Sequence, residues 1–150
     1  MLGFYRSSGT ALLITSYAGK TLKSLLEAGK LSRMNPRDRI RMARQLAEAV
    51  DNINWLGVSH NDISSNNVCI KDTGSGYEMC VIDLGLATTN GMRVVLAGDW
   101  DPEYKGWYAP ELFKRGVELV SGAADAYAVG QLVSKILDTA NLDHDINQWI

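Results

Sequence analysis

The polar residues with the types and spacing for chemistry gather in two short stretches of the sequence. In the first, His60–Asn67, the carboxylate of Asp62 and the carboxamide of Asn67 stand five residues apart. In the second, Asp83 directly follows an apolar run and lies sixteen residues beyond Asn67. Phosphoryl transfer needs a carboxylate that accepts a hydroxyl proton and hard oxygen ligands that hold Mg²⁺ across the phosphates. The three side chains offer one general base and two magnesium ligands.

Each of these residues also has a purely structural interpretation. His-x-Asp is a common tripeptide, and a histidine such as His60 more often packs in a core than reacts. Asn66 and Asn67 are residue types that turns favour, and Asp83-Leu84-Gly85 is a plausible end of a strand. The order and spacing of the whole set therefore carry more weight than any single member.

The helices that position these residues are predicted from the spacing of apolar side chains. Residues 36–56 form the most regular helix, because Asn35-Pro36 suits its first positions and Gly57 suits its end. A shorter helix is predicted over residues 21–28, and a final one from Ser121 to about Asp138. Apolar residues run almost all the way round the final helix, which predicts that it is central and buried. The core-facing positions predicted for residues 36–56 are Ile40, Ala43, Leu46, Ala47, Val50 and Ile53.

A β-hairpin is predicted beside the polar stretches. Two β-prone runs, residues 67–70 and 77–82, are separated by the turn residues 71–76. Cys69 and Cys80 are equally far from the centre of that turn, which predicts that they are cross-strand neighbours. Since the sequence shows no secretory signal, we expect both thiols to be reduced.

The composition is that of one globular domain. The chain has 150 residues, of which 46% are hydrophobic and 21% charged, and its net charge is −2. No basic stripe predicts a nucleic-acid partner, and no apolar run approaches the roughly 20 residues that span a bilayer. We therefore expect a cytoplasmic protein with neither partner. Residues 10–15 predict one strand, and residues 86–109, with three glycines and one proline, predict a long loop.

Taken in order, the motifs resemble those of the large lobe of eukaryotic-type protein kinases. His60–Asn67 is similar to the catalytic loop H-R-D-L-x-x-x-N, and Asp83-Leu84-Gly85 is similar to D-F-G. Ala109-Pro110-Glu111 matches A-P-E. Asp125–Gly130 resembles the D-x-x-x-x-G at the start of the long buried helix of that lobe, and residues 11–18 resemble the hinge between the lobes.

The resemblance implies an α+β fold that is mainly α, namely a protein kinase-like C-lobe in which a small β-hairpin carries the active-site loops. It implies that residues 1–150 form a single partial kinase-like domain, from the hinge through the central buried helix. The small N-lobe, with its Gly-rich phosphate loop and Val-Ala-Ile-Lys strand, and the final helices are expected to be absent. The chain is thus expected to be truncated at both ends.

The same resemblance implies roles for individual residues. Asp62 would be the catalytic base, and Asn67 counts with it among the catalytic residues. Asn67 and Asp83 would hold Mg²⁺ and contact ATP, the two expected cofactors. The hinge would bind the adenine of ATP through the backbone of Ser16, Tyr17 and Ala18. Structural roles would fall to His60, Gly85, Glu111 and Asp125. In the family, Glu111 would pair with an arginine further along the chain, a partner that we expect to be absent together with the final helices.

The sequence departs from the family at several positions of these motifs. Asn61 replaces the arginine that many protein kinases pair with an activation-loop phosphate. Ser64 replaces the lysine of serine/threonine kinases, and Trp107 stands where tyrosine kinases often have tryptophan. Asn66, however, replaces the arginine that tyrosine kinases place in the catalytic loop. The choice between Ser/Thr and Tyr acceptors therefore stays open.

The sequence is compatible with three functions. The first is transfer of the ATP γ-phosphate to a protein hydroxyl, with the missing parts supplied. The second is a pseudokinase-like module that binds proteins without catalysis, in which case apolar surface left uncovered by the N-lobe would serve a partner or self-association. The third is a small-molecule phosphotransferase of the choline kinase and aminoglycoside phosphotransferase type, which shares His-Asn-Asp. Gly85 and Ala109-Pro110-Glu111 favour a protein kinase over the third.

Overall fold

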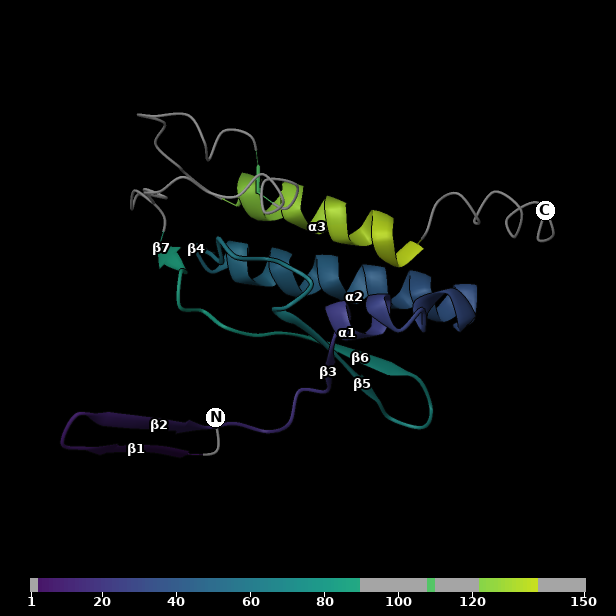
Figure 1. The fold of residues 1–150 in the computed structure, drawn as a ribbon. Helices are drawn as coiled ribbons and strands as arrows, with labels where there is room; N and C mark the ends of the chain where they lie inside the picture. Colours follow the sequence, from purple (N-terminus) through teal and green to yellow (C-terminus); the bar gives the residue numbers. More distant parts are fainter. Residues whose placement is uncertain (1–2, 90–107, 110–121, 138–150) are drawn as a thin grey trace.

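The computed structural model describes residues 3–89, 108–109 and 122–137, and the structural statements below concern these residues. The elements are β1 (Gly3–Ser7), β2 (Thr10–Ile14), β3 (Lys20–Thr21), α1 (Leu22–Glu27), the 3₁₀ turn η1 (Leu31–Arg33), α2 (Pro36–Trp55), β4 (Val58–Ser59), β5 (Val68–Asp72), β6 (Tyr77–Val81), β7 (Thr88–Thr89) and α3 (Ala123–Leu137). Helix α2 forms the middle layer, with α3 on one side and α1 and the β5–β6 hairpin on the other (Figure 1).

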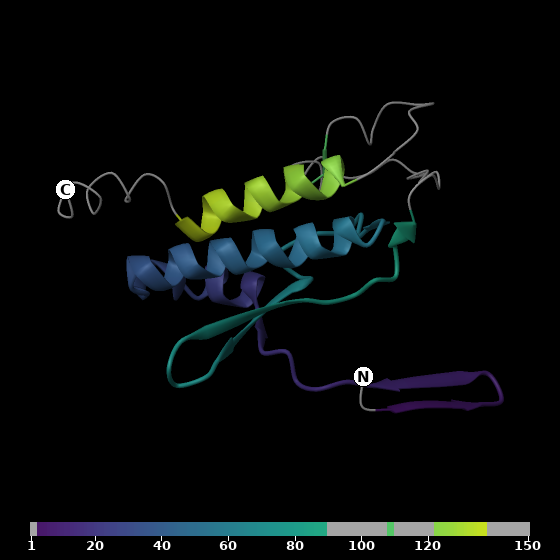
Figure 2. The same cartoon turned by 180° about the vertical axis from the view of Figure 1, so that it is seen from behind.

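Helices α2 and α3 run antiparallel and are joined by side chains at both ends. At one end, Nη1 of Arg39 donates a hydrogen bond to the carbonyl oxygen of Leu137 at 3.0 Å. At the other end, Nδ2 of Asn54 donates to Oδ2 of Asp125 at 2.9 Å. Figure 2 shows from behind that the two helices lie side by side. The two helices therefore form one unit with a fixed register.

Helix α2 begins and ends at the positions that its sequence predicts. Oδ1 of Asn35 accepts a hydrogen bond from the backbone N–H of Arg37 at 2.9 Å, which caps the first turn. Gly57 follows the helix with φ of 74°, a conformation that glycine adopts without strain. The predicted core face is only partly right, because Ile40 is 51% exposed and Ala47 is also exposed. The buried side chains of α2 are Arg39, Met42, Ala43, Leu46 and Val50.

Helix α3 is buried along one face only. Ala128, Leu132 and Ile136 are buried, whereas Tyr127 is 37% exposed. Within the described ranges, α2 is the helix that packs along α3, so the predicted burial on all sides is wrong for these residues. The predicted start of this helix, Ser121, lies outside the described residues.

The hydrophobic core lies between the two long helices and the small sheet. Strand β5 contributes two fully or nearly fully buried side chains, Val68 and Ile70, and α1 contributes Leu22 and Leu25. Burial of such side chains is the main favourable term that holds these elements together. The core consists of Leu22, Leu25, Leu31, Met42, Ala43, Leu46, Val50, Ile63, Val68, Ile70, Ala128, Leu132 and Ile136.

The three-stranded sheet is antiparallel, in the order β3-β5-β6. Cys69 pairs directly with Cys80, which confirms the register predicted from the turn, and both thiols are free as expected. The backbone before β3 lies directly on β5, because a Cβ at Gly19 would clash with the carbonyl oxygen of Ile70. Gly19 also has φ of 108°, which side-chain-bearing residues rarely adopt.

Two pairs of strands differ from the sequence-based expectation. Strand β2 was predicted, but its antiparallel partner β1 was not, and together they form a hairpin that extends away from the helices (Figure 1). Thr88–Thr89, predicted as loop, forms β7 and pairs with β4. No helix in the described part of the chain is long and apolar enough to cross a membrane.

Candidate active site

The loop between β4 and β5 is fixed by a carboxylate that α3 supplies. Oδ2 of Asp125 accepts a hydrogen bond from the backbone N–H of His60 at 2.7 Å, and Oδ1 accepts one from Asn61 at 2.8 Å. Asp125 is 1% exposed and lies in the first turn of α3, where the helix dipole favours a negative charge. Buried backbone donors that bind a carboxylate form stronger hydrogen bonds than neutral pairs do. Asp125 thus holds the start of the His60–Asn67 loop in place.

His60 links this loop to the strand that precedes Asp83. The imidazole is fully buried, and its Nε2 lies 3.1 Å from the carbonyl oxygen of Ile82. Its Nδ1 accepts a hydrogen bond from the backbone N–H of Asp62 at 3.3 Å. One nitrogen must therefore donate and the other accept, which is the pattern of a neutral imidazole with its proton on Nε2. His60 connects the backbones that carry the two aspartates.

The side chain of Asp62 is held at both oxygens. Nδ2 of Asn67 donates to Oδ2 of Asp62 at 2.7 Å and to its carbonyl oxygen at 2.9 Å. The hydroxyl of Tyr108 donates to Oδ1 at 2.9 Å. A general base must lie within hydrogen-bond reach of the proton that it removes, at about 2.6–3.2 Å. Oδ1 of Asp62 is therefore positioned to receive a proton from a hydroxyl group.

Asp83 lies near Asn67 because the residue before Asp83 is hydrogen-bonded to the backbone of Asn67. The N–H of Ile82 donates to the carbonyl oxygen of Asn67 at 2.9 Å. Asp83 adopts a left-handed conformation, with φ of 67°, and its Oδ1 accepts a hydrogen bond from Gly85 at 3.0 Å. A Cβ at Gly85 would come within 2.9 Å of that oxygen, so a glycine suits this position. The side chain of Asp83 is exposed and keeps its second oxygen available.

The oxygen atoms of Asn67 and Asp83 suit a magnesium ion. Oδ1 of Asn67 and Oδ2 of Asp83 accept no hydrogen bond from the described residues, and both are the hard oxygen ligands that Mg²⁺ prefers. No group of three or more His, Cys, Asp or Glu side chains forms a metal cage in the described ranges. Mg²⁺ usually completes its coordination with phosphate oxygens and water, so two protein ligands fit its chemistry.

Asn61 has a role that the sequence did not reveal. It is buried, has φ of 63°, and its Nδ2 donates to the carbonyl oxygen of Leu86 and to Oγ1 of Thr88, both at 2.9 Å. It also donates to the carbonyl oxygen of Ser59 at 3.2 Å. The sequence showed only that Asn61 replaces an arginine. The one available signal was that asparagine tolerates the left-handed region better than most residues.

Tyr108 was also missed as a residue of this site. It precedes the buried Ala109, and the sequence gives no spacing rule that would bring its hydroxyl to Asp62, 46 positions earlier. Glu111, whose arginine partner was expected to be absent, lies outside the described residues. Asp125, predicted as a structural residue, lies beneath the His60–Asn67 loop as described above.

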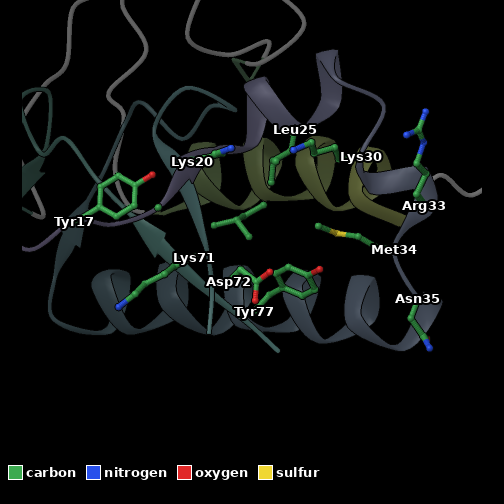
Figure 3. A pocket seen from close by; sticks show the side chains of 12 residues that line it. Tyr17, Lys20, Leu25, Lys30, Arg33, Met34, Asn35, Lys71, Asp72 and Tyr77 are labelled. Carbon is green, nitrogen blue, oxygen red and sulfur yellow. The ribbon is translucent and has the colours of Figure 1, made fainter. Parts of the chain in front are cut away.

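The predicted adenine-binding segment lies between β2 and β3. Ser16 and Tyr17 are exposed, and Ala18 is half-buried. Of these three residues, Tyr17 lines a pocket of about 720 Å³, which Figure 3 shows from close by. None of the candidate active-site residues Asp62, Asn67 and Asp83 lines this pocket. Nucleotide contacts of the segment therefore remain a prediction.

Comparison with known proteins identifies the family. The model of the protein kinase domain matches residues 1–148. Dual specificity testis-specific protein kinase 2 is 26% identical in Homo sapiens over 113 residues and 29% identical in Mus musculus over 111. These matches cover 71% of this chain but only 19% of the relatives, so the chain spans a minor part of their length.

The structure gives a consistent result. The kinase PK-1 of Cydia pomonella granulovirus aligns with a TM-score of 0.67 and 21% identity, over 91% of this chain and 47% of that one. At this identity the likeness shows the fold, which is kinase-like as the motifs implied. Since the family model matches nearly the whole sequence, the chain belongs to the protein kinase domain family.

Proposed function

We propose that this chain is the large lobe of a protein kinase, which transfers the γ-phosphate of ATP to a protein hydroxyl when the nucleotide-clamping parts of the domain are supplied. The carrying observation is the position of Asp62, whose Oδ2 is held by Asn67 at 2.7 Å and whose backbone is linked through His60 to Ile82, the residue before Asp83. That arrangement suits a base that removes a hydroxyl proton.

The remaining residues of the site either position Asp62 or would bind Mg²⁺. Asn67 orients the carboxylate through its amide and offers its carbonyl oxygen, with Asp83, to Mg²⁺. The ion supplies charge neutralisation at the phosphates. His60 holds the backbone of Asp62, and Asp125 holds the loop on which all of them lie. The acceptor hydroxyl would approach Oδ1 of Asp62 and lose its proton there.

A second candidate function is a pseudokinase-like module that binds proteins without catalysis. The observation in its favour is that Tyr108 already occupies Oδ1 of Asp62, the oxygen that an acceptor hydroxyl needs. A small-molecule phosphotransferase is less well supported, because the matched family and the curated relatives are protein kinases.

A thermal-shift experiment with Mg²⁺ and a non-hydrolysable ATP analogue tests nucleotide binding. At one hundred times its dissociation constant, a ligand stabilises the folded state by about 2.7 kcal/mol. The shift should disappear in Asp83→Ala and persist in the control Asp51→Ala, which removes an exposed carboxylate from α2. No shift in the unmodified chain would contradict nucleotide binding.

Phosphoryl transfer to a library of Ser, Thr and Tyr peptides tests catalysis. Because positioned general bases contribute about 10²–10⁴-fold, Asp62→Ala should lower the rate by that factor. Asn66→Ala is the matched control, since Asn66 is the exposed neighbour of Asn67. A nucleotide shift without transfer to any peptide would favour the binding module, and equal rates in Asp62→Ala and Asn66→Ala would refute the assignment of the base.

A further inference from the structure

The pocket of about 720 Å³ lies apart from the residues of the candidate active site. Its volume falls in the range of about 300–1,000 Å³ that is usual for ligand sites. The segment before β3, the α1–η1 region and the β5–β6 hairpin form its walls. Apolar side chains form its floor, namely Leu25, Met34, Ile70 and Tyr77.

The walls of this pocket are held by the fold. Leu25 and Ile70 belong to the core, and Met34 and Tyr77 pack against it. Gly19 lies against the backbone of Ile70 so closely that no side chain fits there, which fixes the segment leading into β3. The cavity is therefore formed before any ligand arrives, which lowers the entropic cost of binding.

The rim of the pocket is strongly basic. Lys20, Lys30, Arg33 and Lys71 line it, against the single carboxylate of Asp72. None of the four cations forms an ion pair with a residue of the described ranges. Their concentration here is notable because the chain as a whole has a net charge of −2.

Cations on neighbouring surfaces behave differently. Lys23 on α1 lies 4.0 Å from Glu27, and Arg44 on α2 lies 2.6 Å from Glu48. Asp72 offsets only one of the four positive charges, and its Oδ1 accepts a hydrogen bond from the backbone N–H of Gly74 at 2.8 Å. The pocket thus combines an apolar floor with positive charge that no described residue pairs.

We propose that this pocket docks an acidic peptide segment of a protein partner. An apolar side chain of the peptide enters the space toward which Met34 points, and flanking carboxylates meet Lys20 and Lys30 along one edge (Figure 3). The facing edge, with Asp72 and Tyr77, orients the peptide by its polar groups. Nucleic acid fits less well, because only four cations line the pocket and the net negative charge of the chain repels a long polyanion.

Fluorescence anisotropy with a labelled peptide of the type Glu-Glu-Leu-Asp-Glu-Leu-Glu-Asp tests the proposal. The double variant Lys20→Glu/Lys30→Glu should bind this probe at least roughly tenfold more weakly, because like charges then face each other. Lys23→Glu is the matched control on α1 and should bind within about twofold of the unmodified chain, since Lys23 does not line the pocket. Added salt should weaken binding, as expected for exposed charges.

Altered probes and a further variant separate the apolar and ionic contributions to peptide binding. A probe in which lysine replaces each acidic residue should not bind, and a probe without leucine should bind more weakly. Met34→Ala should weaken binding of the leucine-containing probe while the urea midpoint confirms that the variant is folded. Equal binding by Lys20→Glu/Lys30→Glu and Lys23→Glu would overturn the proposal, and so would tighter binding of a single-stranded RNA oligonucleotide than of the acidic probe. Binding should persist in Asp83→Ala, so this test succeeds or fails independently of the proposed phosphotransfer.

Discussion

The most direct test of how the active-site loop is held is the substitution Asp125→Asn. The carboxylate of Asp125 has two acceptor oxygens, and both serve buried donors: the backbone N–H groups of His60 and Asn61 and the side-chain amide of Asn54. A carboxamide has the same shape but only one acceptor oxygen. One backbone N–H of the loop must then face an NH₂ group.

The expected loss of stability follows from these contacts. One buried N–H without an acceptor costs about 1–3 kcal/mol, and the surviving hydrogen bonds each lose about 1 kcal/mol because the acceptor is no longer charged. The free energy of unfolding should therefore fall by about 3–5 kcal/mol in Asp125→Asn. That is a large part of the roughly 5–15 kcal/mol that stabilises a typical domain.

Urea unfolding followed by circular dichroism measures this change. With an m-value of about 2 kcal/mol/M, the midpoint should fall by about 2 M. The control Asp51→Asn makes the same chemical change at an exposed position of α2 and should stay within about 0.5 kcal/mol of the unmodified chain. A loss below about 1 kcal/mol in Asp125→Asn, or an equal loss in both variants, would refute the conclusion that this carboxylate fixes the loop.

The further predictions concern Tyr108, Cys69 and Gly19. Tyr108→Phe removes the hydroxyl that binds Asp62, the proposed base, and should raise kcat/KM for an acceptor peptide about tenfold, with the KM for ATP unchanged; an unchanged kcat/KM would contradict this. Burial, and secondarily the charge of Cys80, raise the pKa of Cys69, so iodoacetamide at pH 8 should modify the exposed Cys80 well before Cys69. Because unfolding releases Cys69 to an ordinary pKa, the free energy of unfolding should also fall as the pH rises through the ordinary thiol range. Gly19→Ala should lower the free energy of unfolding by about 2–4 kcal/mol in urea titrations, whereas Gly29→Ala, where φ is also positive but no atom lies near, should cost only about 1 kcal/mol.

The parts of the fold that the sequence predicted are those with local causes. Helix α2 begins at an asparagine cap and ends at a glycine, and both signals act within one turn of the helix. The pairing of Cys69 with Cys80 follows from the symmetry of a short turn. The buried face of α2 was less predictable, because α3 decides which side is covered. Ile40 therefore lies in water while Met42 is in the core.

In the candidate active site, too, the sequence predicted the contacts between nearby residues but not those between distant ones. Asp62 and Asn67 are five residues apart, so a loop motif was sufficient to group them. Tyr108, whose hydroxyl binds Asp62, lies 46 positions later in the sequence, so no local motif groups the two residues. Strand β7 has only two residues, which is too short to show a periodic pattern of apolar side chains. Asn61 was visible only as the absence of an arginine, since its hydrogen bonds to Leu86 and Thr88 depend on where the chain after Asp83 returns.

The dependence of the loop on α3 also bears on the order in which the protein folds. The hydrogen bonds from His60 and Asn61 to Asp125 span 65 and 64 positions of the chain, and contacts of such separation form late because the intervening loop must first close. During synthesis the residues of the His60–Asn67 loop emerge well before the helix that shapes them. Until α3 docks, their N–H groups bind water. We therefore expect the arrangement of the candidate active site to be one of the last features that the folding chain acquires.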